Sequence, residues 1–315
     1  MDPFCIAHIS DLHLSPEFKT INIRNTRRVL EYILQHQVDH IVLTGDIAAN
    51  AEERDFLLVR DILGSYGLLD AGRLTVIVGN HDIYGGVHAV EDILSFPDRC
   101  RITDYERKLL RFHEQFQETF EGAHFASEAF LYPFSKTFRD VVLIGLNSVR
   151  RYSLFSNPIG SNGRVDDYQQ RLAKQLLNDP RIEKKKKIAL VHHHFCKVNS
   201  KAQGTMHSVW GVIERHTMKL RGRNSLVRLL KKGGVELVLH GHLHESIEYM
   251  KDGVRFLNAG ASVVSKGSSD LRVNFVRVSD EGIGTEIHTL PAGIDHDLPA
   301  PRSIPQDPYS SQEAA

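Results

Sequence analysis

The chain has 315 residues, a formal net charge of zero and 41% hydrophobic residues, which suits one large α/β domain or two small ones. This charge balance excludes a protein that coats nucleic acid through bulk positive charge, and only a local basic patch is compatible with it. Three scattered cysteines, Cys5, Cys100 and Cys196, form neither a disulfide framework nor a thiolate zinc motif. The first residues have no signal-peptide pattern and no apolar run reaches membrane-spanning length, so we expect a cytoplasmic protein.

Short apolar runs, each ending in polar residues or glycine, are predicted to be buried strands. They are Cys5–Ile9, His40–Leu43, Leu74–Val78, Val141–Leu146, Ile188–Val191 and Glu236–Leu239. Helical patterns lie between them, at Ile23–Leu34, Glu52–Leu63, Asp166–Leu177 and Asn224–Lys231. This alternation predicts an α/β fold with much parallel strand pairing.

The pattern changes after residue 244. Alternating segments separated by turns are predicted to form antiparallel hairpins that complete a second sheet. They are Ser246–Met250, Val254–Asn258, Leu271–Val278 and Thr285–Leu290. We therefore expect a β-sandwich of two mixed sheets flanked by helices, formed by residues 1–294. The proline-rich residues 295–315 are predicted to be a disordered tail.

Residues 84–134 do not fit the alternation of strands and helices. Phe112, Phe116 and Phe120 recur at helical spacing within this insert. One interpretation is a helix that buries an aromatic face against the body of the protein. The other is a cap that contacts an apolar part of a ligand.

Polar side chains that can bind metal follow the predicted strands directly. They are Asp11, His13, Asp46, Asn80, His81, Asp82, His192, His193, His194, His242 and His244. Because ligands of open α/β sheets bind at the carboxyl ends of the strands, we expect these residues to converge. Carboxylate, amide and imidazole donors without a thiolate suit Mn, Fe or Zn. Their number exceeds what one tetrahedral ion needs and predicts two divalent ions that share a carboxylate.

The order of these motifs resembles the calcineurin-like metallophosphoesterase superfamily over residues 4–260. The motifs are Asp11-Leu12-His13, Gly45-Asp46, Gly79-Asn80-His81-Asp82, His192-His193-His194 and Gly241-His242-Leu243-His244. The resemblance implies that Asp11, His13 and His244 hold one metal ion. The other ion would be held by Asn80, His242 and a histidine of the triple run, His192 or alternatively His193. Asp46 would bridge the two ions.

The resemblance also implies roles for two residues that do not bind metal. His81 would contact the phosphate and protonate or stabilise the leaving oxygen, and Asp82 would orient the His81 ring through a hydrogen bond. Metal-activated hydroxide would attack phosphorus. Phe195 departs from the pattern, since related phosphodiesterases often have proline there.

Within the superfamily the chain is most similar to bacterial cyclic-nucleotide-type phosphodiesterases, which implies hydrolysis of a small phosphorylated molecule. A pyrophosphohydrolase of a nucleotide-linked lipid sugar would suit the aromatic insert, but such enzymes usually carry arginine where this chain has His81. A DNA nuclease would need a basic groove and a long extension. A non-catalytic interaction module would lack at least one metal ligand, whereas every ligand position is filled here. No nucleic-acid or membrane binding is indicated, and the last β segments could pair across a homodimer.

Some basic residues and histidines outside the motifs leave two interpretations open. The run Lys184–Lys187 is either a solvated helix end and loop or a contact for a polyanionic substrate. His207 and His216 belong either to a substrate loop or to an ordinary surface loop. Five arginines could ring the site, although the sequence does not fix where their side chains point: Arg150, Arg151, Arg221, Arg223 and Arg228.

Overall fold

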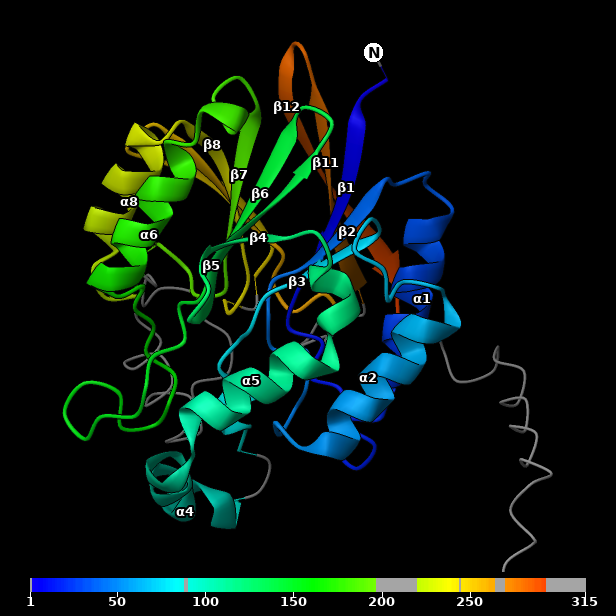
Figure 1. Ribbon diagram of the computed structural model, residues 1–315. Helices are drawn as coiled ribbons and strands as arrows, with labels where there is room; N and C mark the ends of the chain where they lie inside the picture. The colour runs from blue at the N-terminus through cyan, green and yellow to red at the C-terminus, as the bar shows by residue number, and fades with distance from the viewer. Residues whose placement is uncertain (1, 88–89, 197–219, 244, 264–269, 293–315) are drawn as a thin grey trace, which may run out of the picture.

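Two β-sheets form the centre of the protein in a computed structural model that describes residues 2–87, 90–196, 220–243, 245–263 and 270–292 (Figure 1). The five-stranded sheet has the order β12 (Gly282–Pro291), β11 (Asp270–Ser279), β1 (Phe4–Ile9), β2 (His40–Leu43) and β3 (Leu74–Val76). The seven-stranded sheet has the order β4 (His124–Ser127), β5 (Phe130–Phe138), β6 (Val141–Leu146), β7 (Lys186–Val191), β8 (Val235–His240), β10 (Val254–Asn258) and β9 (Ile247–Lys251).

Each sheet contains a block of parallel strands. β1, β2 and β3 run parallel to one another, and so do β6, β7, β8 and β10. The remaining pairings are antiparallel: β11 and β12 lie on one side of β1, and β4 with β5 and β9 lie at the two edges of the seven-stranded sheet. The parallel strands place the loops that follow them at one end of each sheet, which is where ligands of such sheets bind.

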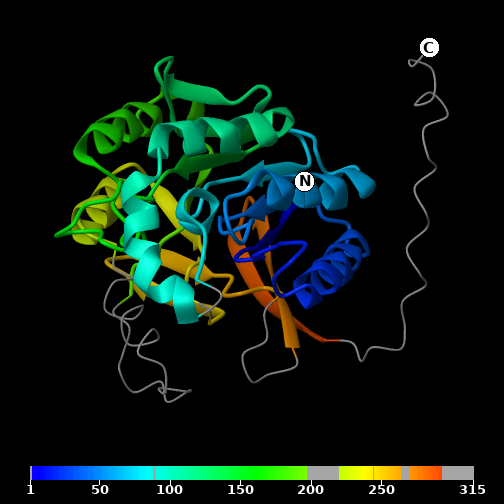
Figure 2. The ribbon, with the colours of Figure 1, turned by 90° about the horizontal axis from the view of Figure 1, so that it is seen from below.

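Helices cover the outer faces of the two sheets. Figure 2 shows the blue helices α1 (Ile21–Leu34) and α2 (Glu53–Ser65) on one side, and the green α6 (Asp167–Leu177) and yellow α8 (Arg223–Lys232) on the other. α6 begins where the Asp166 carboxylate accepts a hydrogen bond from the Gln169 amide at 2.7 Å, a typical N-cap.

The period-2 alternation of strand side chains divides the apolar core into two layers. Leu143, Leu190 and Leu239 pack in the layer between the sheets, with residues of β1, β2 and β3. Their neighbours Val142 and Val191 pack on the opposite face, against α6 and α8. Because both faces of the seven-stranded sheet are buried, its parallel strands are apolar throughout rather than alternating.

The insert is largely helical, with α3 (His81–Tyr84), α4 (Val90–Ile102), α5 (Tyr105–Gln115) and the 3₁₀ turn η1 (Gln117–Phe120). A second 3₁₀ turn, η2 (Pro180–Ile182), precedes β7. Phe112 and Phe116 are buried, and their rings lie 6.1 and 6.2 Å from that of Phe56 in α2. The aromatic spacing therefore reflects packing of α5 against the body of the protein.

The predicted strands and helices are all present, with ends that differ by at most three residues, the largest difference being at the start of β12. The prediction for the final hairpins was wrong in one respect, because they do not complete a single sheet. β10 pairs with β8 and with β9, so this hairpin belongs to the seven-stranded sheet. β11 pairs with β1 and with β12, so that hairpin belongs to the five-stranded sheet. Lys186 and Lys187 also lie in β7 rather than in a loop. Residues 295–315 lie outside the described part of the chain.

Across the residues that the structure describes, every helix is too short or too polar to cross a membrane.

Candidate metal centre

The loops that carry the predicted ligands have an unusual backbone. Asp11, His13, Asp46 and His242 have positive φ angles of 55°, 46°, 52° and 68°. This left-handed conformation is disfavoured for residues with a side chain, and it persists only where the surroundings enforce it. Here the loops after β1 and β2 hold each other: the Asp11 amide donates to the Gly45 carbonyl at 3.1 Å, and the His13 amide donates to the Asp46 carbonyl at 3.0 Å.

Glycines let these loops approach one another closely. A Cβ atom on Gly79 would lie 2.2 Å from the Asp46 nitrogen, and a Cβ on Gly241 would lie 2.4 Å from Asp11 Oδ2. Both distances are far below van der Waals contact. The glycines of the Gly-Asn-His-Asp and Gly-His-x-His motifs are therefore required because any side chain would displace the two carboxylates.

Asp82 ties the loops after β2 and β3 together. Its Oδ1 accepts hydrogen bonds from the amides of Ile47 and Ala48, both at 2.9 Å, and its Oδ2 accepts from the Gly79 amide at 2.8 Å. The prediction that Asp82 orients the His81 ring was wrong, because both carboxylate oxygens point inward to these backbone amides. Nδ1 of His81 instead faces the Ala49 carbonyl at 3.3 Å.

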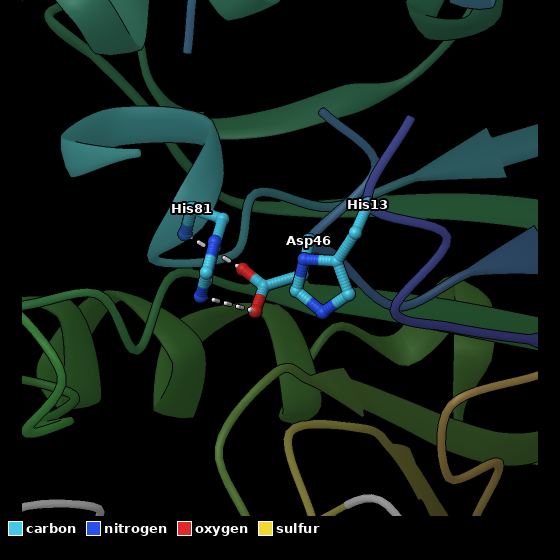
Figure 3. A group of neighbouring side chains, drawn as sticks. All are labelled: His13, Asp46 and His81. Carbon is cyan, nitrogen blue, oxygen red and sulfur yellow. Dashed lines mark hydrogen bonds and ion pairs between the residues drawn. The ribbon is translucent and has the colours of Figure 1, made fainter. Parts of the chain in front are cut away.

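One group of side chains that could hold a metal ion consists of His13, Asp46 and His81 (Figure 3). Their ligand atoms lie within 4.8 Å of one another, and the three residues come from the loop after β1, the loop after β2 and the start of α3. His81 Nε2 is 4.0 Å from Asp46 Oδ2, and its amide donates to Asp46 Oδ1 at 2.8 Å. The His81 side chain is 23% exposed, whereas those of the other two are at most 7% exposed, so His81 lies on the open side of the group.

A second group consists of Asp46, His192 and His242, all of them buried. Nδ1 of His192 lies 2.7 Å from the Thr44 carbonyl, which can only accept a hydrogen bond, so Nδ1 carries the proton. Nε2 of His192 then faces two oxygens, Asp46 Oδ1 at 3.3 Å and Asn80 Oδ1 at 3.1 Å. Asp46 belongs to both groups and is the one residue they share.

The donors fit divalent metal ions. His242 Nε2 is buried and makes no hydrogen bond to any described residue. The lone pairs of His192 Nε2, Asp46 Oδ1 and Asn80 Oδ1 point toward one another. Unless His192 takes up a second proton, no hydrogen lies between these atoms, and a cation bound there would stabilise them. Imidazole nitrogen together with carboxylate and amide oxygen suits Mn, Fe or Zn.

The site carboxylates differ in pKa. Burial raises the pKa of Asp11 to about 7. Burial also acts to raise the pKa of Asp46, but the positive charges of His192 and His81 outweigh it and hold this pKa well below its usual range. Asp46 is therefore the carboxylate that remains ionised most readily at the point where both groups meet.

His192 and His193 of the triple histidine run differ in their hydrogen-bond partners. Both ring nitrogens of His193 have protein partners, the Ser148 hydroxyl at 2.8 Å and the Ser161 carbonyl at 3.3 Å, whereas Nε2 of His192 faces the shared Asp46. Ser148 was not among the predicted site residues, although it follows β6 as the other site residues follow their strands. Phe195, where related enzymes have proline, is buried 4.7 Å from the Phe256 ring.

The structure thus brings most of the predicted ligands together. The Asp11 carboxylate joins them by accepting a hydrogen bond from the His242 amide at 2.9 Å, and it lies 4.0 Å from His13 Nε2. His244 lies outside the described residues, and so do His207 and His216.

Comparison with known proteins agrees with this geometry. The family model of the calcineurin-like phosphoesterases matches residues 5–246, and the chain belongs to this family. Members of the family are metallophosphoesterases, which hydrolyse phosphoesters with a pair of divalent metal ions. Among curated proteins, none matches the chain.

Several solved structures share the fold at low sequence identity. A dimetal phosphatase from the zebrafish Danio rerio superposes with a TM-score of 0.56 at 12% identity, over 93% of this chain and 100% of that chain. Purple acid phosphatase PPD1 from yellow lupin has a TM-score of 0.56 at 12% identity, over 90% and 51% of the two chains. GAP50 of Plasmodium, an anchor in the inner membrane complex, has a TM-score of 0.53 at 13% identity, over 92% and 89%.

Proposed function

We propose that the protein is a phosphodiesterase that hydrolyses a small phosphorylated molecule with a dinuclear metal centre. The observation that carries the proposal is the position of Asp46 in both groups of buried donors. A carboxylate shared in this way can bridge two ions that clamp one phosphate between them. The resemblance of the Gly79–Asp82 motif to that of phosphodiesterases favours a diester as the substrate.

The ligand assignment follows the two groups. Asp11 and His13, together with His244, would hold one ion, and the other ion would be held by the set Asn80, His192 and His242. Mn, Fe or Zn ions bound there would neutralise charge on the phosphoryl oxygens and make water a stronger nucleophile. His192 rather than His193 is assigned because both nitrogens of His193 are already hydrogen-bonded by the protein.

His81 is proposed as the proton donor to the leaving oxygen. Its ring is the most exposed of the group, and the Ala49 carbonyl 3.3 Å from Nδ1 holds the ring with Nε2 toward Asp46. A proton on Nε2 is then positioned to pass to an alkoxide that departs from phosphorus. Asp82 contributes indirectly, since its three backbone hydrogen bonds hold the loops that carry Asp46 and His81.

The test is an assay of Mn-reconstituted protein with bis-p-nitrophenyl phosphate and p-nitrophenyl phosphate. We expect turnover of the diester by the wild type and its loss in Asp46→Asn, which removes the shared charge but keeps the side-chain volume. Asp98→Asn, in an exposed acid of α4, is the matched control and should behave as the wild type.

Hydrolysis of the monoester alone would replace the phosphodiesterase with a phosphatase. Equal activity of the wild type and Asp46→Asn would overturn the proposed centre, because the bridging carboxylate could not then be needed.

A further inference from the structure

Two of the arginines singled out in the sequence, Arg150 and Arg221, lie on neighbouring segments with Arg164 beside the metal centre. Val149 pairs with Gly163, and Gly163 pairs with Leu220, so three short segments lie side by side. The Arg164 amide donates to the Ser148 carbonyl at 2.8 Å, and the Arg221 amide donates to the Gly163 carbonyl at 2.8 Å. Each paired residue is followed directly by an arginine, and these are Arg150, Arg164 and Arg221, called the arginine cluster below.

The arginine cluster is linked to the metal-ligand candidates through the His193 ring. Gly163 packs so tightly on His193 that an added Cβ would be 2.4 Å from the Cγ of that ring. The His193 ring in turn lies 4.4 Å from the His242 ring. On another side, the hydroxyl of Tyr84, which lies in the same short helix as His81, donates to the Arg150 carbonyl at 2.8 Å.

The cluster carries more positive charge than the protein neutralises. Burial lowers the pKa of Arg150, and the charges of Arg221 and Arg164 lower it further. Arg164 pairs with Asp167 at 3.1 Å, whereas Arg150 and Arg221 have no acidic partner among the described residues. Like charges held close together destabilise the fold unless an anion lies between them. Such an arrangement is typical of a binding site for phosphate.

Arg151 and Arg223, two of the other arginines singled out in the sequence, each have a partner of their own. Arg151 forms an ion pair with Glu106. Arg223 donates to the Cys196 carbonyl at 3.3 Å and acts on the pKa of His194 instead. The charge of Arg151 is thus paired with an acid, unlike the charges of Arg150 and Arg221 among the described residues.

An open cavity adjoins the cluster. It has a volume of about 440 Å³, and Arg150 and Arg164 line it together with Tyr105, Tyr152 and Tyr168. Aromatic side chains next to arginines can accommodate the organic part of a substrate while the guanidinium groups bind its charge.

The cluster is positioned for an anion other than the one at the metals. The charges that act most strongly on Asp11 and Asp46 come from histidines and from each other. The arginine segment at Gly163 contacts the His193 ring, and that ring lies 4.4 Å from the ring of the metal-ligand candidate His242. A phosphate clamped at Asp46 and a group held by the arginine cluster would thus be two separate parts of one molecule.

We propose that the arginine cluster binds a second phosphate group of the substrate. The natural substrate is then a phosphodiester that carries a further phosphate besides the one that is cleaved. Guanidinium groups match phosphate oxygens in pairs of parallel hydrogen bonds, which gives both affinity and orientation. This inference rests on the proposed phosphodiesterase function.

A matched pair of substrates tests it in the metal-loaded, full-length protein. One is the 5′-p-nitrophenyl ester of thymidine 5′-monophosphate, and the other is the same ester of thymidine 3′,5′-bisphosphate. In both, water replaces p-nitrophenolate at the 5′ phosphorus, and only the second has an additional phosphate. We expect the wild type to have a KM at least roughly tenfold lower for the bisphosphate, as charge-assisted hydrogen bonds provide.

Arg150→Gln and Arg221→Gln should each bring the ratio of the two KM values toward one. Arg277→Gln, in an exposed arginine of β11, is the control and should keep the wild-type ratio. Calorimetric binding of thymidine 3′,5′-bisphosphate and of thymidine 5′-monophosphate checks the same difference without turnover. If either variant fails to fold, the other variant and the binding measurement still decide.

Equal KM values and equal affinities in the wild type would overturn the inference while leaving the phosphodiesterase proposal intact. A wild-type preference that both glutamine variants retain would also overturn it. Failure of the wild type to hydrolyse either ester or bis-p-nitrophenyl phosphate would instead contradict the proposed function itself.

Discussion

Two clusters of buried polar groups in this protein differ in how completely their hydrogen bonds are formed. Lys136 in β5 is only 4% exposed, and its ammonium donates to the carbonyls of Ala71, Leu74 and Thr119 at 2.6, 2.9 and 2.9 Å. In its charged form the three donors of this side chain thus have three acceptors. In the metal centre, Nε2 of His192 faces two acceptor oxygens that only a second proton on His192 or a cation can satisfy, and Nε2 of His242 has no hydrogen-bond partner among the described residues.

The difference separates a structural role from a functional one. A buried polar cluster whose bonds are complete stabilises a particular packing and needs nothing else. A cluster that brings lone pairs together is costly unless a cation joins it. The left-handed backbone at Asp46 and His242 adds to that cost. The predictions below change the metal centre, then the Lys136 cluster, and last an ion pair outside both, in order of decreasing effect.

The largest effect is expected from adding one methyl group beside the Asp46 carboxylate. In Gly79→Ala the new Cβ would lie 2.2 Å from the Asp46 nitrogen, so the Asp46 loop must move. We expect diester turnover to fall by more than about 100-fold, because changes outside the ligand set already cost ~10–100-fold. Turnover and bound metal are both measured.

Gly64→Ala is the matched control, because its Cβ would meet only the Leu69 side chain at 3.7 Å within α2. This variant should keep full activity and metal content. Full activity in Gly79→Ala would show that the close approach of these loops is not needed for the centre.

A smaller and more selective loss is expected in His81→Ala. Without the proton donor, turnover of an alkyl phosphodiester should fall by about 10²–10⁴-fold. The loss should be smaller for bis-p-nitrophenyl phosphate, because p-nitrophenolate leaves without being protonated. The two losses are compared in metal-loaded protein, and equal losses would exclude His81 as the donor to the leaving oxygen.

The buried cluster of Lys136 and its three carbonyl acceptors is expected to make the free energy of unfolding depend on pH. Burial lowers the pKa of Lys136 from 10.5 to about 7 in the folded protein. Between pH 7 and 10.5 the unfolded chain therefore binds more protons at this side chain than the folded protein, so stability should rise with pH across this window. Relative to Lys136→Met, the free energy of unfolding should rise by on the order of a few kcal/mol.

Denaturant unfolding of the two proteins at several pH values measures this difference. Below pH 7 the lysine is charged in both states, and the difference should no longer change. A difference that is constant from pH 7 to 10.5 would mean that the three carbonyls keep Lys136 charged against its burial.

The smallest effect is expected outside both clusters. Arg101 and Asp98 form an exposed ion pair at 3.1 Å on α4. Because water screens such pairs, Arg101→Gln should change the free energy of unfolding by less than about 0.5 kcal/mol and leave turnover unchanged. A change above ~1 kcal/mol would show that exposed charges contribute as much as the buried clusters.

Much of the fold and site could be predicted because buried strands leave a strong signal in the sequence. The apolar runs ended where Asp11, Asp46, Asn80 and His242 begin, and the structure brings these residues together. The sequence could not separate His192 from His193, because the distinction depends on hydrogen bonds to residues distant in the chain.

Other features depend on contacts that no local pattern encodes. Asp82 follows His81 directly, yet its carboxylate is oriented by amides of the loop after β2. The last two hairpins have similar alternating patterns but join different sheets. The sheet that each joins depends on its pairing with β8 or with β1. The arginine cluster comes from three segments separated by up to about 70 residues, so no spacing in the sequence indicates it.

Metal content tests the central claim most directly. The purified protein is reconstituted with Mn²⁺, freed of excess metal and analysed by mass spectrometry for metal per chain, beside Asp46→Asn. The two donor groups that share Asp46 predict two ions per wild-type chain and fewer in the variant. A wild-type chain that binds no metal, or a variant that binds two ions as tightly, would contradict the dinuclear centre.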